Sequence, residues 1–158
     1  MAGRYASTTE VTSDRTRAEI EKTLTRYGAT GFMYGWLDTH AAVGFVMHER
    51  QVRMVLPMPD RTSREFTHTP GRGLVRTKAD AEKAFDQAVR QSWRALLLIV
   101  KAKLEAIEAG IVTFDHEFGM HMVLPSGRTV AEEVIPAITD AYTTGNVRPL
   151  LQIGGSTS

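Results

Sequence analysis

The feature that most constrains the fold is a long stretch of helical periodicity between residues 78 and 109. Apolar side chains recur there at intervals of three and four, which places them on one face of an α-helix. They are Phe85, Val89, Trp93, Leu96, Val100, Leu104 and Ile107. Thr77 is a suitable N-cap and Gly110 a suitable stop. Residues 96 to 100 are apolar on nearly every side, so we expect the sheet to cover one side and the C-terminal helices or another subunit to cover the other.

Residues 31 to 59 instead show the two-residue period of β-strands. The alternating apolar residues are Phe32, Tyr34 and Trp36, then Val43, Phe45 and Met47, then Val52, Met54 and Leu56. Polar turns at residues 38–40 and 48–50 separate the three runs. Pro57 and Pro59 close the last run because proline cannot donate a hydrogen bond to a ladder. The pattern predicts a three-stranded antiparallel meander.

The rest of the chain predicts shorter helices. The first is expected from about residue 14 to residue 27, with Thr12 or Ser13 as its cap and Gly28 after its end. Residues 1 to 11 and the tail from residue 154 have no sustained period and are expected to fray or to reach toward a partner.

A short helix is expected near residues 114 to 118, followed by a turn at residues 125 to 127 and a last helix from 130 to 142. Thr129 and Glu132 form a capping box, and Pro136 predicts a kink or an early break. Together the elements predict an α+β fold: N-terminal helix, three-stranded antiparallel meander, long helix packed on the sheet, and short C-terminal helices.

The chain of 158 residues predicts a single domain over residues 1–158, with an ordered core from about 12 to 150. Its 42% hydrophobic and 23% charged residues are typical of a globular protein. No apolar run approaches the length of a membrane helix and none resembles a signal peptide. The absence of Cys excludes disulfides, zinc–thiolate sites and thiol nucleophiles, and fits a reducing environment. We therefore expect a cytoplasmic location.

Charge is unevenly distributed along the chain. Residues 1 to 103 contain 17 Lys and Arg against 11 Asp and Glu, whereas residues 104 to 158 contain two against seven. The basic excess is greatest from residue 50 to residue 78, with seven cations against two anions. Much of this stretch is a connection from residue 59 to residue 76, which is long enough to be either functional or poorly ordered. A cluster of Arg in such a loop favours a polyanionic partner.

Single-stranded nucleic acid is the polyanion that this pattern favours, because aromatic residues accompany the cations. Tyr34, Trp36 or Phe66 could stack on bases while the cations follow the phosphates. The candidate nucleic-acid-binding residues are Arg53, Arg61, Arg64, Phe66, His68, Arg72, Arg76, Lys78, Arg90 and Arg94. Three alternatives stay open: Tyr34 and Trp36 belong to the core and the Arg residues to a solvated loop without a specific role, the Arg residues pair with an acidic protein surface, or His68 only hydrogen-bonds locally.

No catalytic site is predicted. The sequence contains no nucleophile elbow, P-loop or dinucleotide-binding glycine motif. His116, Glu117 and His121 resemble the zinc-binding motif of metalloproteases, but histidines five residues apart lie about 140° apart on a helix and cannot face one zinc ion. Asp115 and Glu117, two residues apart, do not converge as an acid–base pair. We expect no metal and no cofactor, and an enzymatic function ranks third.

Four segments resemble a family of small uncharacterised proteins from bacteriophage, prophage and actinobacterial genomes. They are residues 25–29 (TRYGA), 66–70 (FTHTP), 91–105 (QSWRALLLIVKAKLE) and 113–125. The resemblance covers about residues 12 to 145 and implies a phage or mobile-element setting in the cytoplasm of a bacterial host cell, but no reaction and no functional residue. The order of a helix, a meander and a long helix also resembles the core of Rad52-type single-strand annealing proteins, a likeness of topology alone.

Two functions follow as expectations. The first is a phage- or prophage-encoded accessory protein of replication or recombination, oligomeric, that contacts the backbone of single-stranded DNA through the Arg-rich loop. The second is a phage-encoded interaction module that uses the same loop to bind and modulate a host protein.

Overall fold

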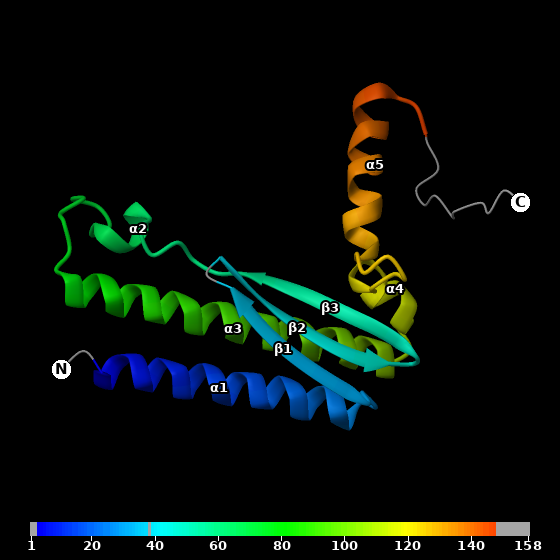
Figure 1. Cartoon of the computed structure of the whole chain (residues 1–158), viewed down its shortest axis with the longest axis horizontal. Helices are drawn as coiled ribbons and strands as arrows, with labels where there is room; N and C mark the ends of the chain where they lie inside the picture. Colours follow the sequence, from blue (N-terminus) through cyan, green and yellow to red (C-terminus); the bar gives the residue numbers. More distant parts are fainter. Residues whose placement is uncertain (1–2, 38, 148–158) are drawn as a thin grey trace, which may run out of the picture.

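The computed structural model describes residues 3–37 and 39–147, with side chains described from residue 13 onward. The elements in chain order are α1 (Gly3–Arg26), β1 (Gly31–Leu37), β2 (His40–Met47), β3 (Arg50–Pro57), α2 (Arg64–Thr67), α3 (Lys78–Glu108), α4 (Phe114–Phe118), the 3-10 turn η1 (Gly119–His121) and α5 (Val130–Thr144) (Figure 1). This is the predicted α+β fold. The predicted end of the ordered core, at residue 150, and the tail from 154 lie outside the described residues.

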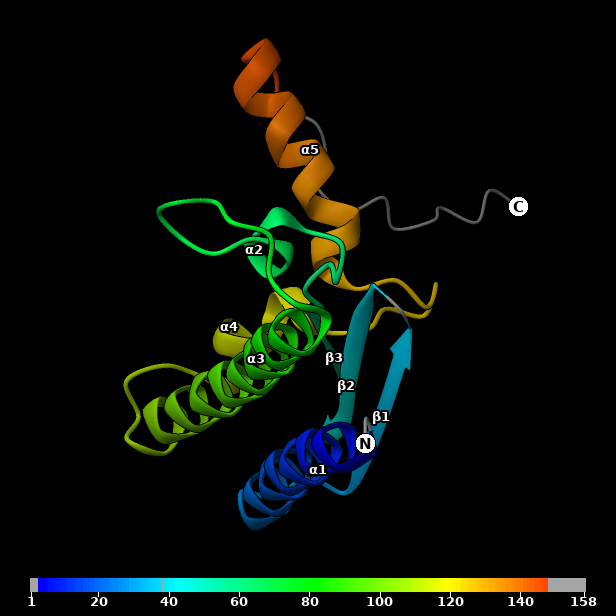
Figure 2. The same cartoon turned by 90° about the vertical axis from the view of Figure 1, so that its left-hand side faces the viewer.

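The sheet is an antiparallel meander in the order β1-β2-β3. Phe32 of β1 pairs with Phe45 of β2, which pairs with Val52 of β3. Helices α1 and α3 lie side by side on one face of this sheet and run in the same direction (Figures 1 and 2). No described helix covers the opposite face of the strands (Figure 2).

The core lies between the sheet and the two long helices. Strand β2 alternates between buried and less buried residues, and its buried members face the helices. The residues that are at most 1% exposed include Ile20 and Leu24 of α1, Phe45 of β2, Leu104 of α3 and Phe118 of α4. The apolar stripes predicted on the long helix and on the strands therefore meet in one core.

Helix α1 begins at Gly3, so the expectation that residues 1 to 11 fray is wrong for residues 3 to 11. Once a helix is anchored by packing, each further residue adds a hydrogen bond at little cost, and residues 4 to 12 contain no Gly or Pro to stop it. The other end is as predicted. Gly28 has a φ of 107°, and hydrogen bonds from Ala29 N to Leu24 O (3.0 Å) and from Gly28 N to Thr25 O (3.1 Å) form a Schellman motif.

The long helix α3 begins and ends where the sequence indicated. The Thr77 hydroxyl accepts a hydrogen bond from Asp80 N at 3.2 Å, and Gly110 follows the helix with a φ of 74°. Leu96 and Val100 are buried, but Leu98 is 66% exposed on the outer side. The expected cover on that side by C-terminal helices is therefore not present.

The connection between β3 and α3 is structured. After α2, Thr69 N donates to Leu74 O at 2.7 Å and Arg76 N donates to Thr67 O at 2.8 Å, which forms a small hairpin. The turn of this hairpin contains Gly71 and Gly73 in left-handed conformation (φ 80° and 64°). The loop therefore presents its tip in a defined position.

Helix α5 has the predicted capping box of Thr129 and Glu132. The early break expected at Pro136 does not occur, because the helix continues to Thr144. Pro136 lacks the N–H that would bond to the Glu132 carbonyl, and that carbonyl accepts from the Arg128 guanidinium instead, at 2.8 Å. None of the described helices is long and apolar enough to span a membrane.

Candidate functional site

A surface groove of about 780 Å³ lies where α1 and α3 meet the end of β1 and the segment that follows β3. We call it the aromatic groove. The lining residues that matter for its chemistry are Ser13, Arg17, Tyr34, Trp36, Asp60, Arg61, Glu82, Phe85, Asp86 and Trp93. The groove brings together residues that lie up to 80 positions apart in the sequence, at the end of the molecule that carries the Arg-rich loop.

One wall of the groove is a stack of rings around a guanidinium. The Arg17 guanidinium carbon lies 4.3 Å from the centroid of the Tyr34 ring and 5.3 Å from that of Trp93. The two rings meet edge to face at 5.8 Å. Arg17 also forms an ion pair with Asp14. This packing holds Arg17 and Tyr34 in fixed positions.

Trp36, two residues further along the same face of β1, is different. Its side chain is 67% exposed, and none of the ring contacts among the described residues involves it. A large ring left in solvent beside a groove loses the stabilisation that burial would give it, so such rings are commonly found at binding sites. Trp36 therefore offers an unoccupied stacking surface at the mouth of the groove.

The groove also contains an unpaired buried polar atom. Ser13 is only 5% exposed, and its Oγ makes no hydrogen bond to any described residue. A buried hydroxyl without a partner costs about 1 to 3 kcal/mol. A ligand with a hydrogen-bonding group in the groove would remove that cost.

The far wall is polar and fixed by ion pairs. Arg61 pairs with Glu82, and its guanidinium lies 4.1 Å from the centroid of the Phe85 ring. Asp60 accepts hydrogen bonds from Thr62 Oγ1 (2.7 Å) and Thr62 N (2.9 Å), which lower the pKa of its carboxyl below the ordinary value of 3.8. Asp60 is therefore ionised at neutral pH and can accept hydrogen bonds.

The balance of charge in the groove decides which ligand it suits. Two cations, Arg17 and Arg61, line it together with three carboxylates, those of Asp60, Glu82 and Asp86. Such a lining does not favour a phosphate chain inside the groove. It suits a flat, uncharged ring with hydrogen-bonding groups on its edge, which is the chemistry of a nucleobase.

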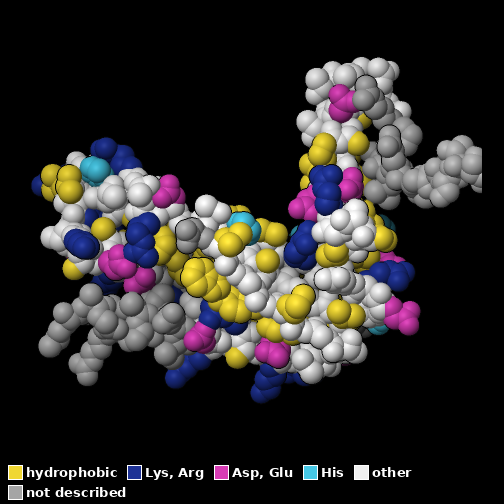
Figure 3. All heavy atoms as spheres, viewed as in Figure 1, with side chains coloured by type: hydrophobic (Ala, Val, Ile, Leu, Met, Phe, Trp, Pro, Cys, Tyr) yellow, Lys and Arg dark blue, Asp and Glu magenta, His cyan; other side chains and the backbone are white. Residues whose placement is uncertain are grey.

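Three predicted residues in the connection between β3 and α3 and at the start of α3 remain available for a polyanion. Arg64, Arg72 and Lys78 are exposed, and their side chains form no hydrogen bond or ion pair within the described part of the chain. They lie on α2, at the tip of the hairpin and at the start of α3. Figure 3 shows Lys and Arg side chains gathered at this end of the molecule. We call these three residues the exposed cations.

Other residues predicted for the site have structural contacts. Phe66 is 3% exposed and packs edge to face against Phe85, with centroids 5.6 Å apart, so its ring is not open to a base. His68 shares a hydrogen bond of 2.8 Å between Nδ1 and Thr67 Oγ1, which is the local role left open as an alternative. Arg76 is half-buried and donates from Nε to the His68 carbonyl at 3.1 Å.

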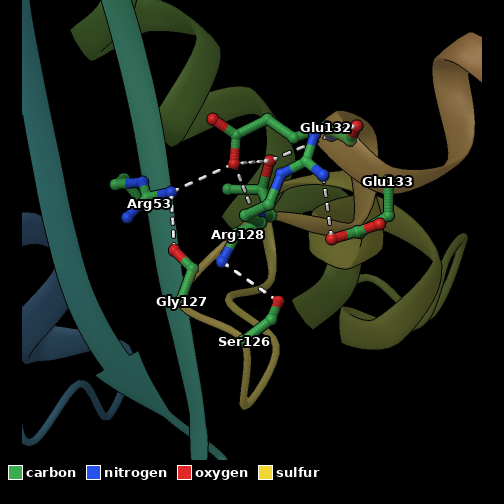
Figure 4. A network of polar contacts seen from close by, with 7 residues as sticks. Arg53, Ser126, Gly127, Arg128, Glu132 and Glu133 are labelled. Atoms are coloured by element: carbon green, nitrogen blue, oxygen red, sulfur yellow. Dashed lines mark hydrogen bonds and ion pairs between the residues drawn. The ribbon is translucent and has the colours of Figure 1, made fainter. Parts of the chain in front are cut away.

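Arg53 is not part of the loop cluster. It lies on the sheet face opposite the long helices, and one guanidinium nitrogen donates to Gly127 O at 3.0 Å and to a Glu132 carboxylate oxygen at 3.1 Å (Figure 4). Arg90 and Arg94 lie further along α3, where Arg90 is half-buried and Arg94 is exposed. The hydrogen bond and charge of Lys101, and to a smaller extent the charge of Arg94, lower the pKa of Glu19 on α1. Arg53, Arg90 and Arg94 lie outside the loop cluster and do not line the aromatic groove.

The histidines of the C-terminal part do not form a metal site with other described residues. Within residues 3–37 and 39–147, no three His, Asp or Glu side chains are grouped closely enough to hold a metal ion. His121 lies half-buried, and burial together with the nearby Lys103 lowers the pKa of its imidazole. It is neutral at pH 7.

Sequence reasoning missed Ser13, Arg17 and Asp86. They lie on helix faces that the periodicity marks only as polar, and no local signal shows that these faces line a groove. Comparison with protein-family models, with curated proteins and with solved structures finds no match for this chain. The family resemblance and the phage setting that it implies therefore stay predictions.

Proposed function

We propose that this protein binds single-stranded nucleic acid, with a base in the aromatic groove and the adjoining phosphates on the exposed cations. The observation that carries the proposal is the exposure of Trp36 beside a groove that also holds Tyr34, Arg17 and the unpaired Ser13 hydroxyl. Such binding suits an accessory protein of replication or recombination.

The groove favours a single strand because a base must leave its stack to enter it. Stacking of a base on an aromatic side chain is worth about 1 to 3 kcal/mol and accepts any base. The Asp60 carboxylate can accept from a ring N–H or an exocyclic amino group, and Ser13 Oγ can either donate or accept. In a duplex the base faces are stacked and the ring N–H groups of the pairing edge are used, so a base can stack on Trp36 only after unpairing.

The exposed cations supply the phosphate contacts. Arg61 at the groove and Arg64 on α2 are three residues apart, so the groove and the cations are neighbours. If Arg64, Arg72 and Lys78 each neutralise one phosphate, the slope of log K against log salt for a single strand is about −0.7 per contact, or about −2 in all.

The experiment is a titration of a labelled oligonucleotide, followed by fluorescence anisotropy, over a series of salt concentrations. Single-stranded DNA, single-stranded RNA and duplex DNA of the same length are compared. We expect single strands to bind more tightly than the duplex, with a salt slope near −2. The absence of binding at low salt would refute the proposal.

Charge-reversal variants test where the strand lies. Arg64→Glu with Arg72→Glu removes two phosphate contacts and reduces the salt slope to about −0.7. Lys22→Glu with Arg26→Glu changes the net charge equally at the far end of α1, where both residues are exposed. If the two double variants weaken binding alike, only net charge matters and the proposed location is wrong.

A second candidate uses the same cations in a different way. Arg64, Arg72 and Lys78 could instead contact an acidic surface of a host protein. Such a contact would not need the Trp36 ring or an unstacked base. A pull-down from a nuclease-treated lysate, repeated with Trp36→Ala, distinguishes the two candidates. If wild type and Trp36→Ala both retain one defined protein, the partner is a protein. If nuclease treatment removes all binding, the partner is a nucleic acid.

A further inference from the structure

The sheet face opposite the long helices is uncovered and apolar. Figure 3 shows apolar side chains gathered over the strands, and the helices lie behind them (Figure 2). We call this surface the open sheet face; its small and apolar residues are Met33, Gly35, Leu37, Ala42, Gly44, Val46 and Val55, and His40, Gln51, Arg53 and Pro57 lie on the same face at its margin and end. Met33 is 65% exposed, Leu37 63% and Val55 53%. An apolar face of this kind on a three-stranded sheet is commonly an interaction site.

The open sheet face has small residues on two neighbouring strands. Gly35 of β1 pairs with Ala42 of β2, and Gly44 of β2 pairs with Met33 of β1. A Cβ added at Gly35 would meet no atom within 4 Å, so the space above it is open. Side chains of a packing helix could lie over these small residues.

Helix α5 is a helix without a packing partner along most of its length. It points away from the body (Figures 1 and 2), and among the other elements it contacts mainly η1 at its base. The base is fixed by the bond from Arg53 to Glu132 and by the ion pair of Arg128 with Glu133 (Figure 4). An isolated helix of 15 residues is marginal in water, so contacts beyond its base would stabilise it.

The projecting helix is amphipathic. Ile135, Ile138 and Tyr142 are spaced by three and four residues and form one stripe, and Ile135 is 50% and Tyr142 90% exposed. Glu133 and Asp140 lie about 200° around the helix from Ile135 and Tyr142. The stripe could therefore face an apolar surface while the carboxylates stay in water.

We propose that α5 of one copy of this chain packs on the open sheet face of a second copy, head to tail. One chain carries both surfaces, and their lengths match: about 22 Å for a 15-residue helix and about 27 Å for an eight-residue strand. The fixed base directs α5 away from its own sheet, so the contact is between copies. Because the two surfaces differ, each copy can bind one neighbour through α5 and another through its open sheet face, and the assembly is a closed ring or an open filament.

Charge complementarity supports a second copy as the occupant. Helix α5 has three acidic residues and no Lys or Arg, whereas residues 1 to 103 of the chain have a basic excess of 17 against 11. Head-to-tail packing places the acidic helix, with its carboxylates on the solvent side, beside a body of net positive charge, so the long-range electrostatic interaction between copies is attractive. Packing of two open sheet faces on each other would instead bring two basic bodies together.

The test is the mass in solution, measured by sedimentation velocity and light scattering over a range of concentrations, without nucleic acid. Wild type is expected to exceed the monomer mass of 17.5 kDa as concentration rises. Met33→Asp on the open sheet face and Tyr142→Asp on α5 are each expected to be monomeric. Leu98→Asp, at an equally exposed position on the outer side of α3, is the control and should assemble as wild type does.

Mixing the two monomeric variants gives the decisive result. Met33→Asp keeps an intact α5 and Tyr142→Asp keeps an intact sheet face, so one contact can form and a dimer of twice the monomer mass should appear. If the mixture stays monomeric, or if wild type is monomeric throughout, the proposal is wrong. Circular dichroism checks that each variant folds, and Val55→Asp on β3 replaces Met33→Asp if β1 does not tolerate the change.

Discussion

The proposed stacking role of Trp36 makes a prediction that separates binding from folding. Trp36→Ala removes a ring that is 67% exposed, so only about a third of its surface contributes to the core. Full burial of a large apolar side chain is worth about 1.5 to 3 kcal/mol, so the free energy of unfolding should fall by about 1 kcal/mol or less.

The same change should weaken binding far more. Loss of one base–aromatic stack costs about 1 to 3 kcal/mol, which raises the Kd for single-stranded DNA about 5- to 160-fold. The salt slope should not change, because the three phosphate contacts are still present. Trp36→Phe keeps a ring and should retain most of the affinity.

Anisotropy titrations at several salt concentrations measure both quantities, and thermal unfolding measures stability. Leu98→Ala is the matched control, because Leu98 is 66% exposed but lies away from the groove. A Kd for Trp36→Ala within twofold of wild type would refute the stacking role. A change in the salt slope with no other effect would show that the ring acts only by positioning the cations.

Three further predictions concern the hydrophobic core and the N-terminal base of α5. Phe118 is fully buried, and its ring meets the Phe45 ring edge to face with centroids 5.5 Å apart. Phe118→Ala should therefore lower the free energy of unfolding, measured by denaturant titration, by about 3 to 5 kcal/mol. A loss below about 1 kcal/mol would contradict the described core. Thr129→Ala removes the N-cap of α5 and should lower the stability of the helix by about 1 kcal/mol. The backbone amides of the first turn of α5 should then exchange with solvent faster. Unchanged exchange would show that the cap is not needed. Hydrogen bonding from the Thr129 backbone, with the nearby Arg53, lowers the pKa of Glu132 below 4.5. Its folded-state pKa is thus below its unfolded one, so the stabilisation is present above pH 4.5 and is lost as the pH falls through the folded-state pKa. Glu132→Gln should therefore be less stable than wild type at pH 7, and the difference should shrink in acid; a constant difference would contradict the pairing.

The parts of the fold that the sequence predicted are those with local causes. The three- and four-residue period of α3, the alternation along the strands, the Thr77 cap and the capping box of Thr129 and Glu132 all depend on neighbours in the sequence. Where packing decides, prediction was weaker. Helix α1 extends to Gly3, although its first turns have no apolar period.

The site shows the same division. The closeness of Arg64, Arg72 and Lys78 along the chain can be seen in the sequence, and all three side chains are exposed in the structure. The burial of Phe66 against Phe85, 19 positions away, depends on how α2 docks on α3, which no local pattern reveals. The pairing of Arg53 with Glu132 likewise depends on contact between residues 79 positions apart.

The most direct test of the central claim is ultraviolet crosslinking of the wild-type protein to single-stranded DNA, with the crosslinked residue identified by mass spectrometry. A base stacked in the aromatic groove should give crosslinks at Trp36 or Tyr34, and an excess of unlabelled single strand should abolish them. Crosslinks confined to residues outside the groove, such as Met33 on the open sheet face or Tyr142 on α5, would contradict the account.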